Sequence, residues 1–193
     1  EQARHFYGKS CEGGNHRGCS KLAFLFIEGL GGSKDGTAAV KLFEHSCDAR
    51  FAVSCFNAGR IYSVGDGLAK DSAVAARYFR KACDLRHGNG CGALGYLYHE
   101  GLGVGENHEL ARHYFREACD RHSMSGCYNL GYMLQLGEGG KVDFQEARWL
   151  YKKACDWGHA KGCAGLGEMF EKKLGGNEGY TAGRRLYEQA CDL

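Results

Sequence analysis

Eleven cysteines are the residues of this 193-residue chain with the most obvious chemistry. A thiol can form a disulfide, bind a metal ion or act as a nucleophile. The gaps between successive cysteines alternate between 8 and 28 residues, as their positions show: Cys11, Cys19, Cys47, Cys55, Cys83, Cys91, Cys119, Cys127, Cys155, Cys163 and Cys191. The chain is therefore a repeat with a period of 36 residues, present in about five and a third copies.

Other residue types recur with the same period and predict two helices in each copy. In one copy, Cys91, Leu94 and Tyr98 share an apolar face of a first helix, and Ala111 and Phe115 share that of a second. Glycines between the two helices suit the left-handed residue that ends a helix. Because one copy cannot bury both faces alone, the copies must stack. We expect an all-α fold, an α/α solenoid forming a right-handed superhelix, with residues 1–193 as one domain without an internal boundary.

The cysteine spacing permits two regular disulfide registers. The short register pairs Cys11–Cys19, Cys47–Cys55, Cys83–Cys91, Cys119–Cys127 and Cys155–Cys163. The long register pairs Cys19–Cys47 and onward to Cys163–Cys191. Loop entropy contributes about 2.5 kcal/mol for the short register and about 3.5 kcal/mol for the long one, which does not decide between them. The short loop closes more readily from the unfolded chain, so we predict the short register, with Cys191 left over. Structural disulfides imply an oxidising compartment.

Signals for metal or enzyme chemistry are weak. The sequence contains no C-x-x-C or H-E-x-x-H, and its nine histidines do not follow the 36-residue period, so we expect surface histidines and no metal site. The motifs S-x-x-K and G-x-S-x-G are also absent. We therefore expect no cofactor and assign no catalytic residue, and an enzyme is the less favoured class.

Charge and hydropathy exclude two kinds of partner. The formal net charge is +2 and there is no basic block, so we expect no nucleic-acid partner. The longest apolar run, residues 22–27, is far too short to span a bilayer.

A binding surface is predicted on the first helices. Positions two, five and nine after the second cysteine lie opposite the core and vary between copies. The candidate residues are Phe24, Glu28, Asn57, Arg60, Tyr96, Glu100, Asn129, Tyr132, Glu168 and Lys172. First helices line the concave side of such solenoids, so these residues are expected to form one continuous groove. Aromatic residues beside an arginine are typical of interface hot spots. The alternative is that the tyrosines pack between neighbouring copies.

The complete pattern resembles a known family. A 36-residue helix pair with small residues in the first helix, a G-x-G loop and an A-x-x-[YLF]-[YF]-x-x-A-C segment is similar to the Sel1-like repeat family, which is related in shape to tetratricopeptide repeats. The C-x7-C element, as in Cys83 to Cys91, resembles the cysteine-rich branch of that family, including the Helicobacter cysteine-rich proteins, in which a disulfide clamps each hairpin. A second disulfide-bridged branch contains cytochrome c oxidase assembly factors of the mitochondrial intermembrane space.

This resemblance implies a non-enzymatic scaffold or adaptor that binds a partner protein or peptide in a secreted or periplasmic setting. Some cysteine-rich members are described as penicillin-binding with slow β-lactamase activity, which leaves a β-lactam or cell-wall fragment as an alternative ligand. A further alternative is an assembly factor of a membrane complex in the intermembrane space. A disulfide-exchanging redox protein is less favoured, because catalysis calls for one low-pKa pair rather than the same pair in every copy.

Overall fold

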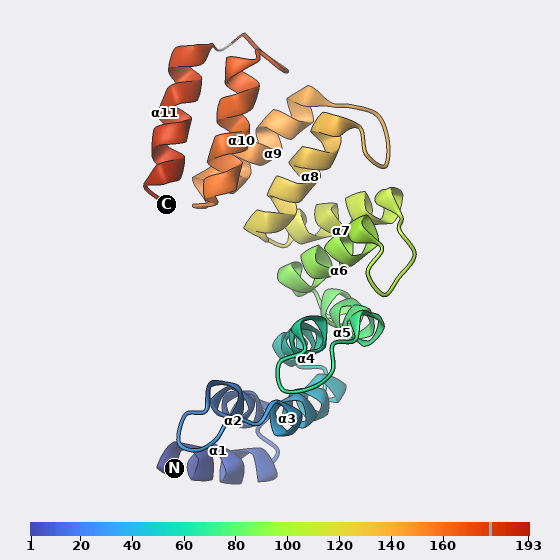
Figure 1. Ribbon diagram of the computed structural model, residues 1–193, viewed down its shortest axis with the longest axis vertical. Helices are drawn as coiled ribbons and strands as arrows, with labels where there is room; N and C mark the ends of the chain where they lie inside the picture. Colours follow the sequence, from blue (N-terminus) through green and yellow to red (C-terminus); the bar gives the residue numbers. More distant parts are fainter. Residues whose placement is uncertain (178) are drawn as a thin grey trace. The chain divides into compact units, whose positions relative to one another are not determined.

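The computed structural model of the protein describes residues 1–177 and 179–193. Over these residues the fold is all-α, without strands (Figure 1). The helices are α1 (Gln2–Glu12), α2 (His16–Glu28), α3 (Gly36–Asp48), α4 (Ala52–Val64), α5 (Ser72–Asp84), α6 (Gly88–Glu100), α7 (His108–Asp120), α8 (Met124–Leu136), α9 (Phe144–Asp156), α10 (Ala160–Glu171) and α11 (Tyr180–Cys191). Their succession confirms the predicted all-α solenoid of helix hairpins.

The helices fall into two compact units. Unit 1 comprises residues 1–90 and 101–105, and unit 2 comprises residues 91–100 and 106–193. Within each unit, helices that follow one another in the chain pack together, as α2 does on α3 and α8 on α9. We call α2, α4, α6, α8 and α10 the first helices and α3, α5, α7, α9 and α11 the second helices. A single uninterrupted solenoid over residues 1–193 stays a prediction.

The second helices begin with a recurring cap. An Asp or Asn accepts a hydrogen bond on its Oδ1 from the backbone N–H three residues later, which satisfies one of the free amides of the first turn. The capping residues are Asp35, Asp71, Asn107 and Asp143. The first helices α2, α4 and α8 end at a left-handed glycine, as predicted, for example at Gly137 with φ of 78°, whereas α10 ends at Lys172 in the right-handed helical region. These caps and glycines mark the starts of four second helices and the ends of three first helices.

The long loops pack back on the preceding second helix through a recurring glycine. In unit 2 this residue is Gly139, with φ of 66°. A Cβ built on it would overlap the carbonyl oxygen of His108 at the start of α7. In unit 1, Gly67 lies in the same way against Gly36 at the start of α3. Only glycine fits where the backbones approach this closely.

Each unit has its own hydrophobic core. In unit 1, Val40, Phe43 and Ile61 are buried among small residues. In unit 2, the core includes Phe115, Leu130, Met133, Tyr151 and Met169. Buried apolar area of this kind is the main source of stability of helical repeats.

The recurring glycine of the first helices α4, α6, α8 and α10 faces an aromatic ring of a second helix. A Cβ on Gly131 would lie 3.1 Å from the ring of Tyr151, and one on Gly95 would lie 3.0 Å from the ring of Phe115. The glycines therefore allow the ring of the second helix to lie against the first helix.

The disulfides follow the short register. They join Cys11–Cys19, Cys47–Cys55, Cys119–Cys127 and Cys155–Cys163, with Cα–Cα distances of 4.4–4.6 Å. Cys83 and Cys91 are likewise disulfide-bonded, and Cys191 is free and exposed. Each of these four bonds connects the end of α1 or of a second helix to the start of the next first helix.

Among the described helices, none is both long enough and apolar enough to cross a membrane.

Candidate functional site

The aromatic residues predicted for the binding surface lie on the outside of the first helices. Phe24 is 54% exposed, Tyr96 50% and Tyr132 42%. About half of each side chain is therefore in contact with solvent and not with neighbouring helices. The side chains are therefore placed where a partner can reach them.

In unit 2, four predicted residues surround one cavity of about 250 Å³: Tyr96, Glu100, Asn129 and Tyr132. The cavity lies over α6, α7 and α8, and its remaining lining comes from His99, Phe115, Tyr128 and Met133. We call it the tyrosine cavity. Its floor is core, because Phe115 and Met133 are buried, and its walls are partly exposed tyrosines.

In unit 1, the predicted residues line two further cavities. Phe24, Glu28, Asn57 and Arg60 border a cavity of about 70 Å³ between α2 and α4. Phe24 and Asn57 also border a second cavity of about 280 Å³, which extends toward α1.

Two predicted residues, Glu168 and Lys172, lie apart from these three cavities. They form an exposed ion pair with each other, with Lys172 Nζ 2.6 Å from Glu168 Oε1. The hydrogen bond that Lys172 donates to Glu168 raises the pKa of Lys172. Because both side chains are well exposed to solvent, the pair adds little stability.

A charged network lies at the rim of the tyrosine cavity. His99 Nδ1 is 2.8 Å from Glu100 Oε1, and His99 Nε2 is 2.8 Å from Glu138 Oε2. The ring also stacks on His108 at 5.1 Å between centroids. Burial lowers the pKa of His99, but the hydrogen bonds to Glu138 and Glu100 outweigh it and leave the pKa above its usual 6.5. The imidazolium form of His99 is therefore favoured between the two carboxylates.

This network predicts a pH-dependent contribution to stability. A histidine whose pKa is raised by folding contributes its full stabilisation below the unfolded-state pKa of about 6.5, and this is lost as the pH rises through the folded-state pKa. We expect His99→Gln to cost on the order of 1 kcal/mol at about pH 5.5 and much less at about pH 9. Urea unfolding of both proteins at the two pH values measures the difference, and an equal cost at both would show that His99 is not held charged.

Sequence reasoning missed His99 and Tyr128 as site residues. Tyr128 directly follows Cys127, at a position to which no role was assigned from the sequence, and its ring is half-buried in the cavity wall. Burial raises the pKa of Tyr128, and the nearby Tyr132 and Glu168 raise it further. Glu138, which pairs with His99, lies in the loop after α8. No periodic signal in the sequence connects these two residues.

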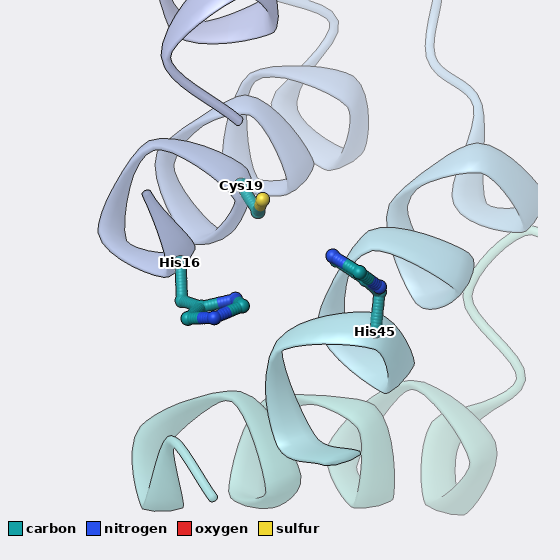
Figure 2. Close-up of side chains that lie close together, drawn as sticks. All are labelled: His16, Cys19 and His45. Carbon is teal, nitrogen blue, oxygen red and sulfur yellow. The ribbon is translucent and has the colours of Figure 1, made fainter. Parts of the chain in front are cut away.

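Unit 1 also brings together a cluster of metal-binding residue types, away from the cavities described above. The ligand atoms of His16, Cys19 and His45 all lie within 4.8 Å of one another (Figure 2). Both histidines were expected to be surface residues and not metal ligands. The structure instead places His16 half-buried on α2 and His45 exposed on α3, side by side.

Hairpins of a 36-residue period, glycine-dependent packing and disulfides in the short turns define a disulfide-braced helical-repeat protein. The Sel1 repeat profile matches this sequence over residues 1–15, 16–50, 52–87, 89–123, 125–159 and 160–193. The chain belongs to the Sel1 repeat family.

Solved structures with the same fold include three of bacterial origin. The protective antigen c5321 of uropathogenic Escherichia coli superposes with a TM-score of 0.91 at 25% identity, over 98% of this chain and 40% of that chain. A Sel1 repeat protein from Oxalobacter formigenes gives 0.85 at 24% identity, over 92% and 73%. Cysteine-rich protein B of Helicobacter pylori gives 0.54 at 28% identity, over 65% and 90%. This chain therefore spans less than half the length of the first of these structures.

The sequence has no significant match among functionally curated proteins.

Proposed function

We propose that this chain is a protein-interaction scaffold that binds a partner polypeptide across the exposed face of its first helices. The tyrosine cavity of unit 2 is the observation that carries the proposal. Its volume of about 250 Å³ is below the range of about 300–1,000 Å³ of small-molecule sites. It suits a single inserted side chain of a polypeptide.

The lining of the tyrosine cavity favours a basic side chain as the occupant. Tyr96, Tyr128 and Tyr132 supply aromatic rings, and a guanidinium binds favourably over such rings. At the rim, Glu100 and Glu138 carry two negative charges against the one positive charge of protonated His99. The local charge is therefore complementary to arginine or lysine.

The disulfides and the likeness to a Helicobacter cysteine-rich protein indicate an oxidising, extracytoplasmic compartment. Within that range, we propose a secreted or periplasmic location. A rigid, cross-linked scaffold suits such a setting, because binding to a preorganised surface costs little conformational entropy.

The test combines one binding-face variant with one matched control. Oxidised wild type, Tyr96→Ala/Tyr132→Ala and Trp149→Ala are immobilised and exposed to lysate from the source organism. Trp149 is 58% exposed and lies on the second helix α9 of the same unit, so its loss removes a comparable exposed aromatic ring outside the cavity. We expect a partner that is retained by wild type and Trp149→Ala but not by the double variant.

A peptide taken from the captured partner then tests the chemistry of the cavity. Replacing its arginine by neutral, nearly isosteric citrulline is expected to weaken binding about tenfold, the effect of losing one cation–π contact of about 1.4 kcal/mol. Equal capture by all three proteins would contradict the first-helix site. Equal affinity of the arginine and citrulline peptides would contradict the proposal that the occupant is basic, but it would not contradict the first-helix site.

A further inference from the structure

Three residues of unit 1 with metal-binding side chains converge between α2 and α3. His16 and Cys19 come from the first turn of α2, and His45 comes from the last turn of α3. Figure 2 shows the three side chains directed into the space between these helices. The two imidazole rings lie 5.6 Å apart, centroid to centroid. The buried hydroxyl of Ser46 on α3 donates to the backbone oxygen of Leu42 at 2.9 Å and lies 3.4 Å from the backbone oxygen of His16, so the two helices are in close contact at the cluster.

One buried nitrogen atom of this cluster makes no hydrogen bond to the described residues. His16 Nδ1 is buried, and it has no hydrogen-bond partner among the residues that the structure describes. Buried polar atoms are nearly always paired, so an exception needs a reason. A metal ion between His16 and His45 would occupy the lone pair of this nitrogen.

The geometry is close to that of a zinc site. Zinc bonds of about 2.0–2.3 Å place neighbouring tetrahedral ligand atoms about 3.5 Å apart. The ligand atoms of the cluster lie within 4.8 Å of one another. Side-chain rotations that move each ligand atom by about 1 Å would therefore bring them to the spacing of a zinc site. Since His45 is exposed, an ion can enter from its side and keep a water molecule as a fourth ligand.

The pair of histidines is particular to this copy of the repeat. One period further along the chain, the position of His16 is Ala52 and the position of His45 is Lys81. Lys81 pairs instead with Asp48 at 3.0 Å. The repeat framework therefore does not require imidazoles at these two positions.

We propose that His16, His45 and Cys19 form a zinc site that is incomplete while Cys19 is in the Cys11–Cys19 disulfide. Reduction of this disulfide completes the site. In the oxidised protein the sulfur of Cys19 is bonded to Cys11 and is a poor ligand, which leaves only the two imidazoles. Reduction adds a thiolate and completes a His₂Cys ligand set, a combination that favours zinc.

The Cys11–Cys19 disulfide is reduced by thiol–disulfide exchange with a dithiol reductant. Cys11 is half-buried whereas Cys19 is fully buried, so the reductant thiolate attacks the sulfur of Cys11 and expels Cys19 as a thiolate. The second thiol of the reductant then releases Cys11 and closes the reductant's own disulfide. Two electrons pass from the dithiol to the protein. One of its two protons ends on Cys11, and the other leaves to solvent because zinc holds Cys19 as the thiolate.

The test frees Cys19 without reducing the other disulfides. Cys11→Ser leaves Cys19 as a thiol, and Cys47→Ser is the matched control because it frees the equivalent Cys55 beside Ala52 and Lys81. Both carry Cys191→Ser, which removes the free exposed thiol. Zinc affinity is measured by calorimetry, and cobalt is used as a spectroscopic probe of thiolate coordination.

We expect Cys11→Ser/Cys191→Ser to bind one zinc ion at least about 100-fold more tightly than either Cys47→Ser/Cys191→Ser or oxidised Cys191→Ser. Its cobalt complex should show thiolate-to-cobalt charge-transfer absorption. Adding His16→Ala and His45→Ala to Cys11→Ser/Cys191→Ser should abolish both signals. Affinity equal to that of the Cys47 control, or binding that survives loss of both histidines, would overturn the proposal.

A second measurement covers the case in which Cys11→Ser fails to fold. Wild-type protein is equilibrated in glutathione redox buffer with and without zinc, alkylated, and analysed by mass spectrometry. Zinc is expected to raise the reduced fraction of Cys11 and Cys19 while leaving that of Cys47 and Cys55 unchanged. A zinc effect that is equal at the two pairs, or absent at both, would contradict the proposed site.

Discussion

Replacing Cys119 and Cys127 together by alanine is expected to lower the free energy of unfolding by about 2.5 kcal/mol. The disulfide closes a loop with a sequence separation of 8, and a loop of that length restricts the unfolded chain by about this amount. Both sulfurs are buried, so the loss of their packing adds to the effect. Guanidinium unfolding of the oxidised proteins, monitored by helical circular dichroism, measures it.

The control is the same comparison under reducing conditions. There the wild type also lacks the cross-link, so its stability should approach that of the variant to within the small packing difference. If the difference persists unchanged after reduction, the stabilisation comes from packing and not from the disulfide.

The substitution Gly139→Ala is expected to destabilise unit 2 by more than about 2 kcal/mol. Two costs combine at this position. A non-glycine residue in the left-handed region costs about 1–2 kcal/mol, and the φ of Gly139 is 66°. The new Cβ would also overlap the carbonyl oxygen of His108, so the loop must move off the start of α7. Thermal unfolding at constant pH measures the loss.

Gly105→Ala is the matched comparison for this prediction. Gly105 belongs to the preceding long loop, and a Cβ added to it meets nothing within 4 Å. Its substitution should leave the stability unchanged or raise it slightly, because alanine restricts the unfolded chain. Equal destabilisation by both substitutions would show that loop glycines act by flexibility rather than by close contact.

The helical-repeat architecture was predictable because the 36-residue period indicates which residues occupy equivalent positions in the fold. Residues that recur every 36 positions occupy equivalent places, so the alternating cysteines predicted both the hairpins and their pairing. The recurring small residues likewise indicated close helix packing, whereas the aromatic ring that Gly131 faces, that of Tyr151, was identified only in the structure. The capping residues Asp35, Asp71, Asn107 and Asp143 carry the same period and were also visible in the sequence.

The candidate site was predictable only in outline. Periodicity indicates which helix face is exposed, and this placed Tyr96 and Tyr132 correctly on the outside. It says nothing about residues that depart from the period, such as His99 with Glu138 or His16 with His45. Their contacts depend on how the helices and loops are placed and on which way each side chain turns, and neither leaves a repeating signal.

The alternation of short cross-linked turns and long open loops makes the chain respond differently to proteolysis at the two kinds of connection. A protease that cuts between Cys119 and Cys127 leaves two fragments joined through sulfur. A cut at residues 138–142 separates the chain covalently, because none of the described disulfides spans that loop. In an environment rich in proteases, the vulnerable bonds are therefore in the long loops, where tight glycine contacts hold the backbone against the preceding helix.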